Sequence, residues 1–197
     1  MLCFIQKYNI KVKDLKMEMY NLIMQRHSSR KFNKNNIQQE DIQKIIDAGL
    51  SAPSGQNAQP WHFTVIQNEE VKQELTKLCK TNFLRFGEDW RKTWANSPNF
   101  NPFYDPNVII VISNKTDVIG SDLDCCFAIQ NMILMAESLG ISSCIVKDIC
   151  WAIDKENQNQ FNIPSGYNCF MSLSLGYAHI KNTKPKTVDY SKVSYIN

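Results

Sequence analysis

A dense group of hydrogen-bond donors occupies residues 26–32, which read RHSSRKF. The segment holds two arginines, one lysine and two serines, all of which can donate hydrogen bonds to an anion. If the segment is extended, alternate side chains face the same way, so Arg26, Ser28 and Arg30 would line one side. The pattern predicts either a solvated basic turn or a seat for an anionic ligand that is touched at several points.

Positive charge gathers at both ends of the 197-residue chain, although the formal net charge is only +3. Residues 1–35 hold eight Lys and Arg against two acidic residues, and residues 181–197 hold four Lys against one. Such termini could bind nucleic acid or a membrane surface, or converge on one small anion. The basic residues are not interleaved with aromatics, and no apolar stretch approaches the ~20 residues of a membrane span. We therefore expect a small-anion site, with neither nucleic acid nor membrane as a partner.

Motifs for metal, disulfide and nucleophilic chemistry are missing from the sequence. The seven cysteines form no CxxC pair, and the three histidines, at positions 27, 62 and 179, have no paired spacing. We expect no metal site and interpret most cysteines as small buried hydrophobes, with a redox role for some as the alternative. The first residues lack a signal-peptide pattern, so the expected location is the cytoplasm.

Hydrophobic periodicity predicts helices and strands without strict βαβ alternation, which is typical of an α+β sandwich of helices around a central sheet. The length favours one domain, residues 17–197, and Met17 could be an alternative start after a possible N-terminal extension, residues 1–16. Helices are expected at 14–25, 39–50, 69–80, 121–139 and 152–160. Strands are expected at 61–67, 108–113, 142–146 and 169–177.

The helix expected at residues 121–139 is apolar on nearly every side between Cys125 and Ala136. Ser121 is expected to cap its start and Gly140 to end it. A helix of this kind must be covered on several sides. We expect a subunit interface along it, and a central helix within a monomer is the alternative.

Three segments in a fixed order carry a resemblance to a known family. RHSSRKF follows a predicted helix, SAPSGQNAQPW at 51–61 precedes a predicted strand, and AESLGISSC at 136–144 ends the long helix. Together they resemble the nitroreductase family of flavoenzymes over roughly residues 17–195. The resemblance implies a nitroreductase-like α+β fold, with a mostly antiparallel central sheet flanked by helices, in an intertwined homodimer. It also implies FMN at the subunit interface, NADH or NADPH as electron donor, and a nitroaromatic, quinone or similar small aromatic molecule as acceptor.

The resemblance assigns cofactor contacts to Arg26, His27, Ser28 and Arg30, which match the family's binding positions. Arg26 would hold the phosphate of FMN, because a guanidinium fork suits a phosphate dianion. Arg30 would reach the pyrimidine end of the flavin ring, where reduction builds negative charge. The resemblance therefore favours the ligand seat over the solvated turn.

Two further segments are assigned by the same resemblance. A basic pair near the C-terminus, here Lys184 and Lys186, would complete the phosphate site, although arginine is commoner at the second position, so the bidentate fork is lost. The backbone of Ile145 and Val146 would lie against the flavin. No glycine follows them in this sequence, where Lys147 stands instead.

The loop of Pro53, Ser54, Gly55 and Asn57 resembles the family segment that reaches the flavin bound mainly by the other subunit. Small residues let the backbone approach a flat ring, and the Asn57 amide can hydrogen-bond to the polar edge of that ring. A loop that merely joins helix to strand is the alternative. Trp61 is expected in the core.

FMN would carry the redox chemistry itself, so no side chain is expected to be catalytic, and kinetics are expected to be ping-pong. The aromatic segment 81–106 is expected either to wall the acceptor pocket or to be ordinary core. Its aromatic residues are Phe83, Phe86, Trp90, Trp94, Phe100, Phe103 and Tyr104. The alternatives are a flavin-binding protein without turnover, and a relative with a different redox reaction such as dehalogenation or flavin fragmentation.

Overall fold

The computed structural model describes residues 12–180 and 186–196, with side chains from residue 19 onward. The chain divides into two compact units, Met1–Arg26 with Lys181–Asn197, and His27–Ile180. The smaller unit holds the helix α2 (Val12–Gln25) and a 3₁₀ turn at Tyr190–Lys192. The larger unit holds the sheet and the remaining helices.

Four antiparallel strands form the sheet, in the order β1-β2-β4-β3. All four predicted strands are confirmed to within two residues at each end. β2 is buried from Val108 to Ser113, which explains its continuous apolar sequence. The strands are β1 (Trp61–Ile66), β2 (Val108–Lys115), β3 (Ser142–Val146) and β4 (Tyr167–Gly176).

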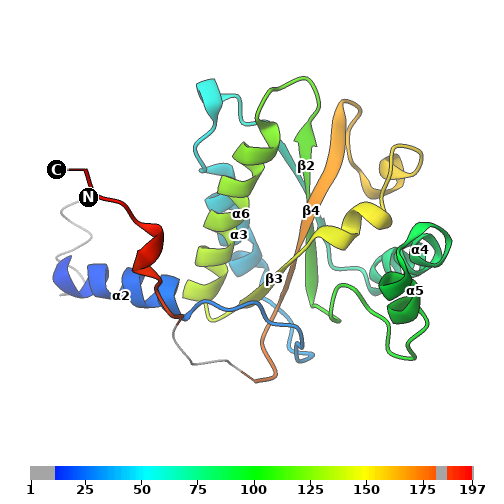
Figure 1. The fold of residues 1–197 in the computed structure, drawn as a ribbon, viewed down its shortest axis with the longest axis horizontal. Coiled ribbons are helices and arrows are strands. Elements are labelled where there is room, and N and C mark those ends of the chain that lie inside the picture. The colour runs from blue at the N-terminus through cyan, green and yellow to red at the C-terminus, as the bar shows by residue number, and fades with distance from the viewer. Residues whose placement is uncertain (1–11, 181–185, 197) are drawn as a thin grey trace. The chain divides into compact units, whose positions relative to one another are not determined.

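Helices cover both faces of this sheet, as the α+β prediction requires (Figure 1). On one face α3 (Gln39–Leu50) packs against α6 (Ser121–Ser138). On the other face lie α4 (Glu69–Phe86) and the short α5 (Asp89–Ala95). The helices predicted at 39–50 and 121–139 are confirmed, and so is the helix predicted at 14–25, which begins two residues earlier.

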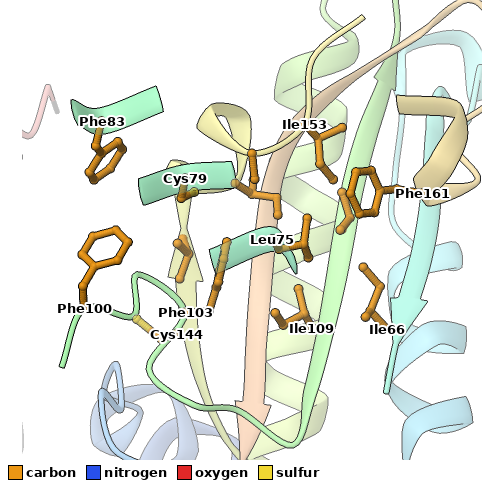
Figure 2. Packing of buried hydrophobic residues seen from close by; sticks show 14 of the residues in the cluster. Ile66, Leu75, Cys79, Phe83, Phe100, Phe103, Ile109, Cys144, Ile153 and Phe161 are labelled. Atoms are coloured by element: carbon orange, nitrogen blue, oxygen red, sulfur yellow. The ribbon is translucent and has the colours of Figure 1, made fainter. Parts of the chain in front are cut away.

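Each face of the sheet has its own apolar core. On one side α4 contributes Leu75, Cys79 and Phe83, which are spaced four residues apart and fully buried (Figure 2). This stripe explains why α4 runs past its predicted end at residue 80, since the last turn is needed to bury Phe83. On the other side Ile45 of α3 and Met132 of α6 belong to one buried cluster.

The helix predicted at 152–160 is wrong. One 3₁₀ turn, Lys147–Trp151, ends before this region, and a second, Gln158–Phe161, covers only its last three residues. The Asp154 carboxylate accepts hydrogen bonds at 2.8 and 3.1 Å from the backbone N–H groups two and three residues later. Such local hydrogen bonds compete with those of a helix, and here they stabilise a turn in place of the predicted helix.

The start of α6 also differs from its prediction. Gly120 is the N-cap residue, with a left-handed φ of 77°, and Ser121 makes no capping bond. The Ser121 hydroxyl instead accepts a hydrogen bond from the Asn114 side chain at 2.9 Å. The end of the helix is as predicted: Gly140 has a φ of 75°, a conformation that favours glycine.

Candidate functional site

The basic segment runs extended beside β3, the edge strand of the sheet. Ser28 forms an isolated parallel bridge with Ser143, and the N–H of Ser29 donates to the Ser143 carbonyl at 2.9 Å. A few residues on, Phe32 pairs antiparallel with Ala178 and buries its ring. The sheet edge thus holds Ser28 next to β3 with its side chain exposed.

Arg30 is exposed and lies over the ring of Tyr104, with 6.0 Å between the guanidinium carbon and the ring centroid. Tyr104 and Asp105 have φ values of 67° and 52°, in the left-handed region that bulky residues rarely adopt. Backbone of this kind costs roughly 1–3 kcal/mol per residue and is concentrated at functional sites. Arg30 therefore presents its charge beside a strained turn.

The end of β3 presents an apolar side chain to solvent. Ile145 is 43% exposed, whereas Val146 is buried and its carbonyl accepts a hydrogen bond from the Ser172 hydroxyl at 3.1 Å. The ammonium of Lys147 donates to the Phe170 carbonyl at 2.7 Å and lies over the Phe170 ring. The lysine thus lies along β4, and Ile145 remains as an apolar surface two residues from Ser143.

Two cations of the predicted phosphate site lie close together in the smaller unit. The N–H of Lys186 donates to the Met24 carbonyl at 3.3 Å, which brings the C-terminal segment against the last turn of α2. Partial burial and the positive charge of Arg26 lower the pKa of Lys186. Among the described residues, no carboxylate forms an ion pair with either side chain. The pair is suited to an anion, which would relieve the repulsion.

The predicted flavin loop forms a 3₁₀ turn, Gly55–Asn57, that is tied down by hydrogen bonds. The N–H of Gly55 donates to both carboxylate oxygens of Asp124 at 3.2 Å, and the N–H of Gln59 donates to the Ser54 hydroxyl at 3.0 Å. Asp124 is buried in the first turn of α6. A bond to a charged acceptor therefore fixes the loop to the start of α6.

The backbone of this loop is strained. Gln56, Asn57 and Gln59 have φ values of 52°, 56° and 45°. Asparagine tolerates this region, but glutamine does not favour it, and each such residue costs roughly 1–3 kcal/mol. All three side chains are exposed, so core packing does not explain the conformation. Strain of this kind indicates a functional loop.

The predicted cofactor residues fall into separate groups. Ser28 and Arg30 share one region with the start of β3 through the bridge to Ser143, and Arg26 and Lys186 are neighbours in the smaller unit. Within one chain, none of the contacts among the described residues joins the loop at 53–57 to Arg30. His27 is half-buried, Pro53 and Asn57 are exposed, and Lys184 lies outside the described residues.

Two contacts of the candidate site are not identified by the sequence: that of Asp124 with Gly55, and that of Tyr104 with Arg30. The contact between Asp124 and Gly55 joins residues 69 positions apart, and a helix-start carboxylate gives no sign of such a partner. The position of Tyr104 over Arg30 depends on a left-handed backbone at a non-glycine residue, for which sequence has no signal.

The aromatic segment divides between core and surface. Phe83, Phe100 and Phe103 are at most 8% exposed, and the first two rings meet edge to face at 5.7 Å (Figure 2). Phe86 and Trp90 are 63% and 56% exposed. The buried rings are ordinary core, so only the exposed ones and Tyr104 remain candidates for an acceptor pocket.

The described part of the chain contains neither a metal-binding cluster nor a membrane-spanning helix. No group of three or more His, Cys, Asp or Glu side chains there could hold a metal ion. None of the described helices combines the length and apolar character that crossing a membrane requires.

Replacing Asp124 with alanine is expected to free the loop. The Gly55 N–H would lose a buried charged acceptor, which costs about 1–3 kcal/mol. Hydrogen exchange of the amides at residues 55–59 should therefore accelerate, while exchange in the strands stays slow. Asp124→Asn keeps one acceptor oxygen, so its exchange rate at residues 55–59 should lie between those of the wild type and the alanine variant.

Asp122→Ala is the matched control, because Asp122 lies in the same helical turn but is exposed. It removes the same favourable charge near the helix N-terminus. Equal acceleration in both alanine variants would show that Asp124 acts through the helix rather than through Gly55.

Known proteins resemble the chain along most of its length. The sequence model described as the nitroreductase family matches residues 23–177. An iodotyrosine deiodinase of Thermotoga neapolitana is 27% identical over 176 residues, which cover 85% of this chain and 91% of the relative. A protein assigned as an NADH dehydrogenase/NAD(P)H nitroreductase of Archaeoglobus fulgidus is 30% identical over 170 residues, covering 81% and 85%.

A solved structure has the same fold. The nitroreductase with bound FMN from Bacteroides fragilis superposes with a TM-score of 0.85 at 27% identity, covering 91% of this chain and 99% of that one. The FMN-bound nitroreductase from Desulfitobacterium hafniense gives 0.81 at 28%, covering 91% and 98%. The antiparallel sheet between helices is therefore the nitroreductase-like fold that the sequence predicts. On the family match and these two structures, the chain belongs to the nitroreductase family.

Proposed function

We propose that this chain is an FMN-dependent oxidoreductase that uses NADH or NADPH to reduce nitroaromatics, quinones or similar acceptors. One observation carries the proposal: the Ser28–Ser143 bridge holds a basic segment against the start of β3, and the exposed Ile145 follows two residues later on the same strand. An elongated ligand with an anionic end and a flat apolar body would use both features. The relatives with bound FMN support that identity for the ligand.

The residues present suit FMN. Arg26 and Lys186, two cations without a carboxylate partner among the described residues, would hold the phosphate, with Lys184 as the predicted third. When bound, FMN supplies the transfer of hydride from nicotinamide and of electrons to the acceptor. Arg30 would provide a fixed positive charge that favours the reduced ring, and Ile145 an apolar surface that excludes water.

The homodimer is part of the proposal because α6 carries an uncovered apolar side. Leu123 and Phe127, one helical turn apart, are 63% and 51% exposed, while Cys125 and Ile129 are buried against the sheet side. Burying such side chains stabilises by about 1.5–3 kcal/mol each. A second copy that covers this side would bury these side chains, and their burial would stabilise the dimer. This agrees with the interface that the apolar sequence of α6 predicts.

The strained loop would then serve the flavin of the other subunit. Its anchor, Asp124, is the residue after Leu123, so the loop lies at the same end of α6 as the exposed apolar side. In a single chain no described contact links the loop to Arg30. A loop held at an interface, away from the flavin site of its own chain, is suited to a site shared between subunits.

Reductive dehalogenation is a second candidate. The observation that favours it is the similarity to the iodotyrosine deiodinase of Thermotoga neapolitana along 85% of this chain. The same cofactor site would serve both reactions, and the exposed Phe86 and Trp90 are candidates for selecting the acceptor. A flavin-binding protein without turnover is the remaining alternative.

A visible spectrum followed by anaerobic addition of NADH or NADPH tests the proposal. The purified protein should be yellow and dimeric by sedimentation, and the flavin band should bleach on addition of the nucleotide. Menadione or nitrofurazone should restore the band, with parallel lines in double-reciprocal plots, as ping-pong kinetics require.

Three outcomes separate the alternatives. Restoration by 3-iodotyrosine, with iodide release, and not by menadione or nitrofurazone would favour dehalogenation. Bleaching no faster than that of free FMN would favour a binding protein. A colourless protein that takes up no FMN would contradict the proposal as a whole.

Gly55→Ala tests whether the loop touches the flavin. A methyl group at Gly55 would meet only the Asp124 carboxylate, at 4.0 Å, so the chain itself tolerates the change. If flavin packs on this backbone, the methyl group should weaken FMN binding about tenfold, equivalent to ~1.4 kcal/mol. The melting temperature of the FMN-free protein is the internal control and should stay the same. Unchanged FMN affinity would remove the loop from the site.

A further inference from the structure

Two cysteines of the larger unit meet side by side. The sulfur of Cys150, in the turn Lys147–Trp151, lies 3.3 Å from the carbonyl oxygen of Cys169 and 3.1 Å from that of Phe170, both in β4. The Cys150 sulfur therefore lies directly beside residue Cys169 on the neighbouring strand. Both residues are partly exposed, and no disulfide joins the six cysteines that the structure describes.

Secondary structure on both sides holds this pair. β3 pairs with β4 only as far as Val146 opposite Ser172, so the turn that follows β3 lies along the next part of β4. The Lys147 ammonium bonds to β4, as described above. From the other side α4 holds the same turn, since Asn82 donates to the Trp151 carbonyl at 2.7 Å and Cys79 donates to the Asp148 carbonyl at 3.0 Å. The contact between the thiols therefore does not depend on a loose loop.

We propose that Cys150 and Cys169 form a reversible dithiol–disulfide pair that is oxidised by hydroperoxides. A hydroperoxide is small enough to reach two partly exposed thiols. A sulfur that already lies 3.3 Å from the carbonyl oxygen of the other cysteine needs little movement to join it. The proposal does not depend on FMN or on the reaction proposed above.

The chemistry needs one hydroperoxide for each pair of thiols. The Cys150 thiolate attacks the peroxide, so that an S–O bond forms, the O–O bond breaks and water or an alcohol leaves, giving a sulfenic acid. The Cys169 sulfur then attacks the Cys150 sulfur; the S–S bond forms, the S–O bond breaks, and hydroxide leaves as water with the Cys169 proton. The two sulfurs together lose two electrons to the peroxide, and a dithiol reductant returns them.

The surroundings give the two cysteines different roles. The Lys147 ammonium and the Cys150 sulfur lie 2.7 and 3.1 Å from the same carbonyl oxygen, that of Phe170, so the cation is close to Cys150. The neighbouring Cys169 thiol and this ammonium lower the pKa of Cys150, whereas the neighbouring Cys150 and burial raise the pKa of Cys169. Cys150 is therefore the attacking thiolate, and Cys169 keeps its proton until the second step. The two carbonyl oxygens beside Cys150 oppose its charge, so an excess of peroxide is expected to be needed.

Peptide mapping of the purified full-length protein tests the pair. Reduced protein is treated with excess hydrogen peroxide, its remaining thiols are alkylated, and it is digested with trypsin without reduction. Cleavage after Lys147, Lys155 and Lys181 puts Cys150 in peptide 148–155 and Cys169 in peptide 156–181. The expected product is these two peptides joined by a disulfide, with two of the seven thiols lost per chain and recovered after dithiothreitol.

Three variants sharpen the result. Cys150→Ser and Cys169→Ser should abolish the joined peptides, whereas Cys126→Ser, which removes an exposed cysteine on α6, should leave them unchanged. The wild-type map alone decides the matter if a serine variant does not fold. Cys150 and Cys169 oxidised separately to sulfinic acids, or unmodified while Cys126 reacts, would overturn the proposal.

Discussion

Two positive charges held together, with no carboxylate of the described residues paired to either, set the condition that the rest of the proposed site must meet. Arg26 and Lys186 are 160 positions apart in the chain, and the Lys186–Met24 backbone bond brings their segments together. Partial burial and repulsion from Arg26 lower the pKa of Lys186. A dianionic phosphate between them would turn repulsion into attraction and raise that pKa again. Like charges gathered at this cost are expected where an anion binds.

The other features of the site follow from the need to hold a long ligand beyond its phosphate. An extended segment can offer alternate side chains along a ligand, and pairing with β3 keeps this one extended. The strained backbone at residues 56–59 and 104–105 needs support, because conformations of this kind cost free energy. The Asp124 carboxylate and the two cores on the sheet provide it. A rigid scaffold thus carries two strained loops, as is common at binding sites.

The local sequence pattern predicts most helices and strands. It does not predict the contacts between positions far apart in the chain. The strands and most helices follow from apolar periodicity, which each segment carries within itself. The end of α4 and the turns near Asp154 depend on a buried Phe83 and on side-chain bonds to backbone, so periodicity misplaces them. The order of three motifs identifies the basic segment and the loop. The Asp124–Gly55 bond and the Cys150–Cys169 contact join distant positions, and only the fold reveals them.

The relative affinities of FMN and riboflavin for the flavin-free protein test the central claim most directly, because the two ligands differ only in the phosphate. The wild-type protein should prefer FMN strongly, and Arg26→Ala and Lys186→Ala should each reduce that preference about tenfold or more, as loss of a charged hydrogen bond predicts. Riboflavin affinity should not change. Lys192→Ala is the matched control, since that lysine already pairs with Asp189 at 3.7 Å. An FMN preference that survives both substitutions would contradict the account.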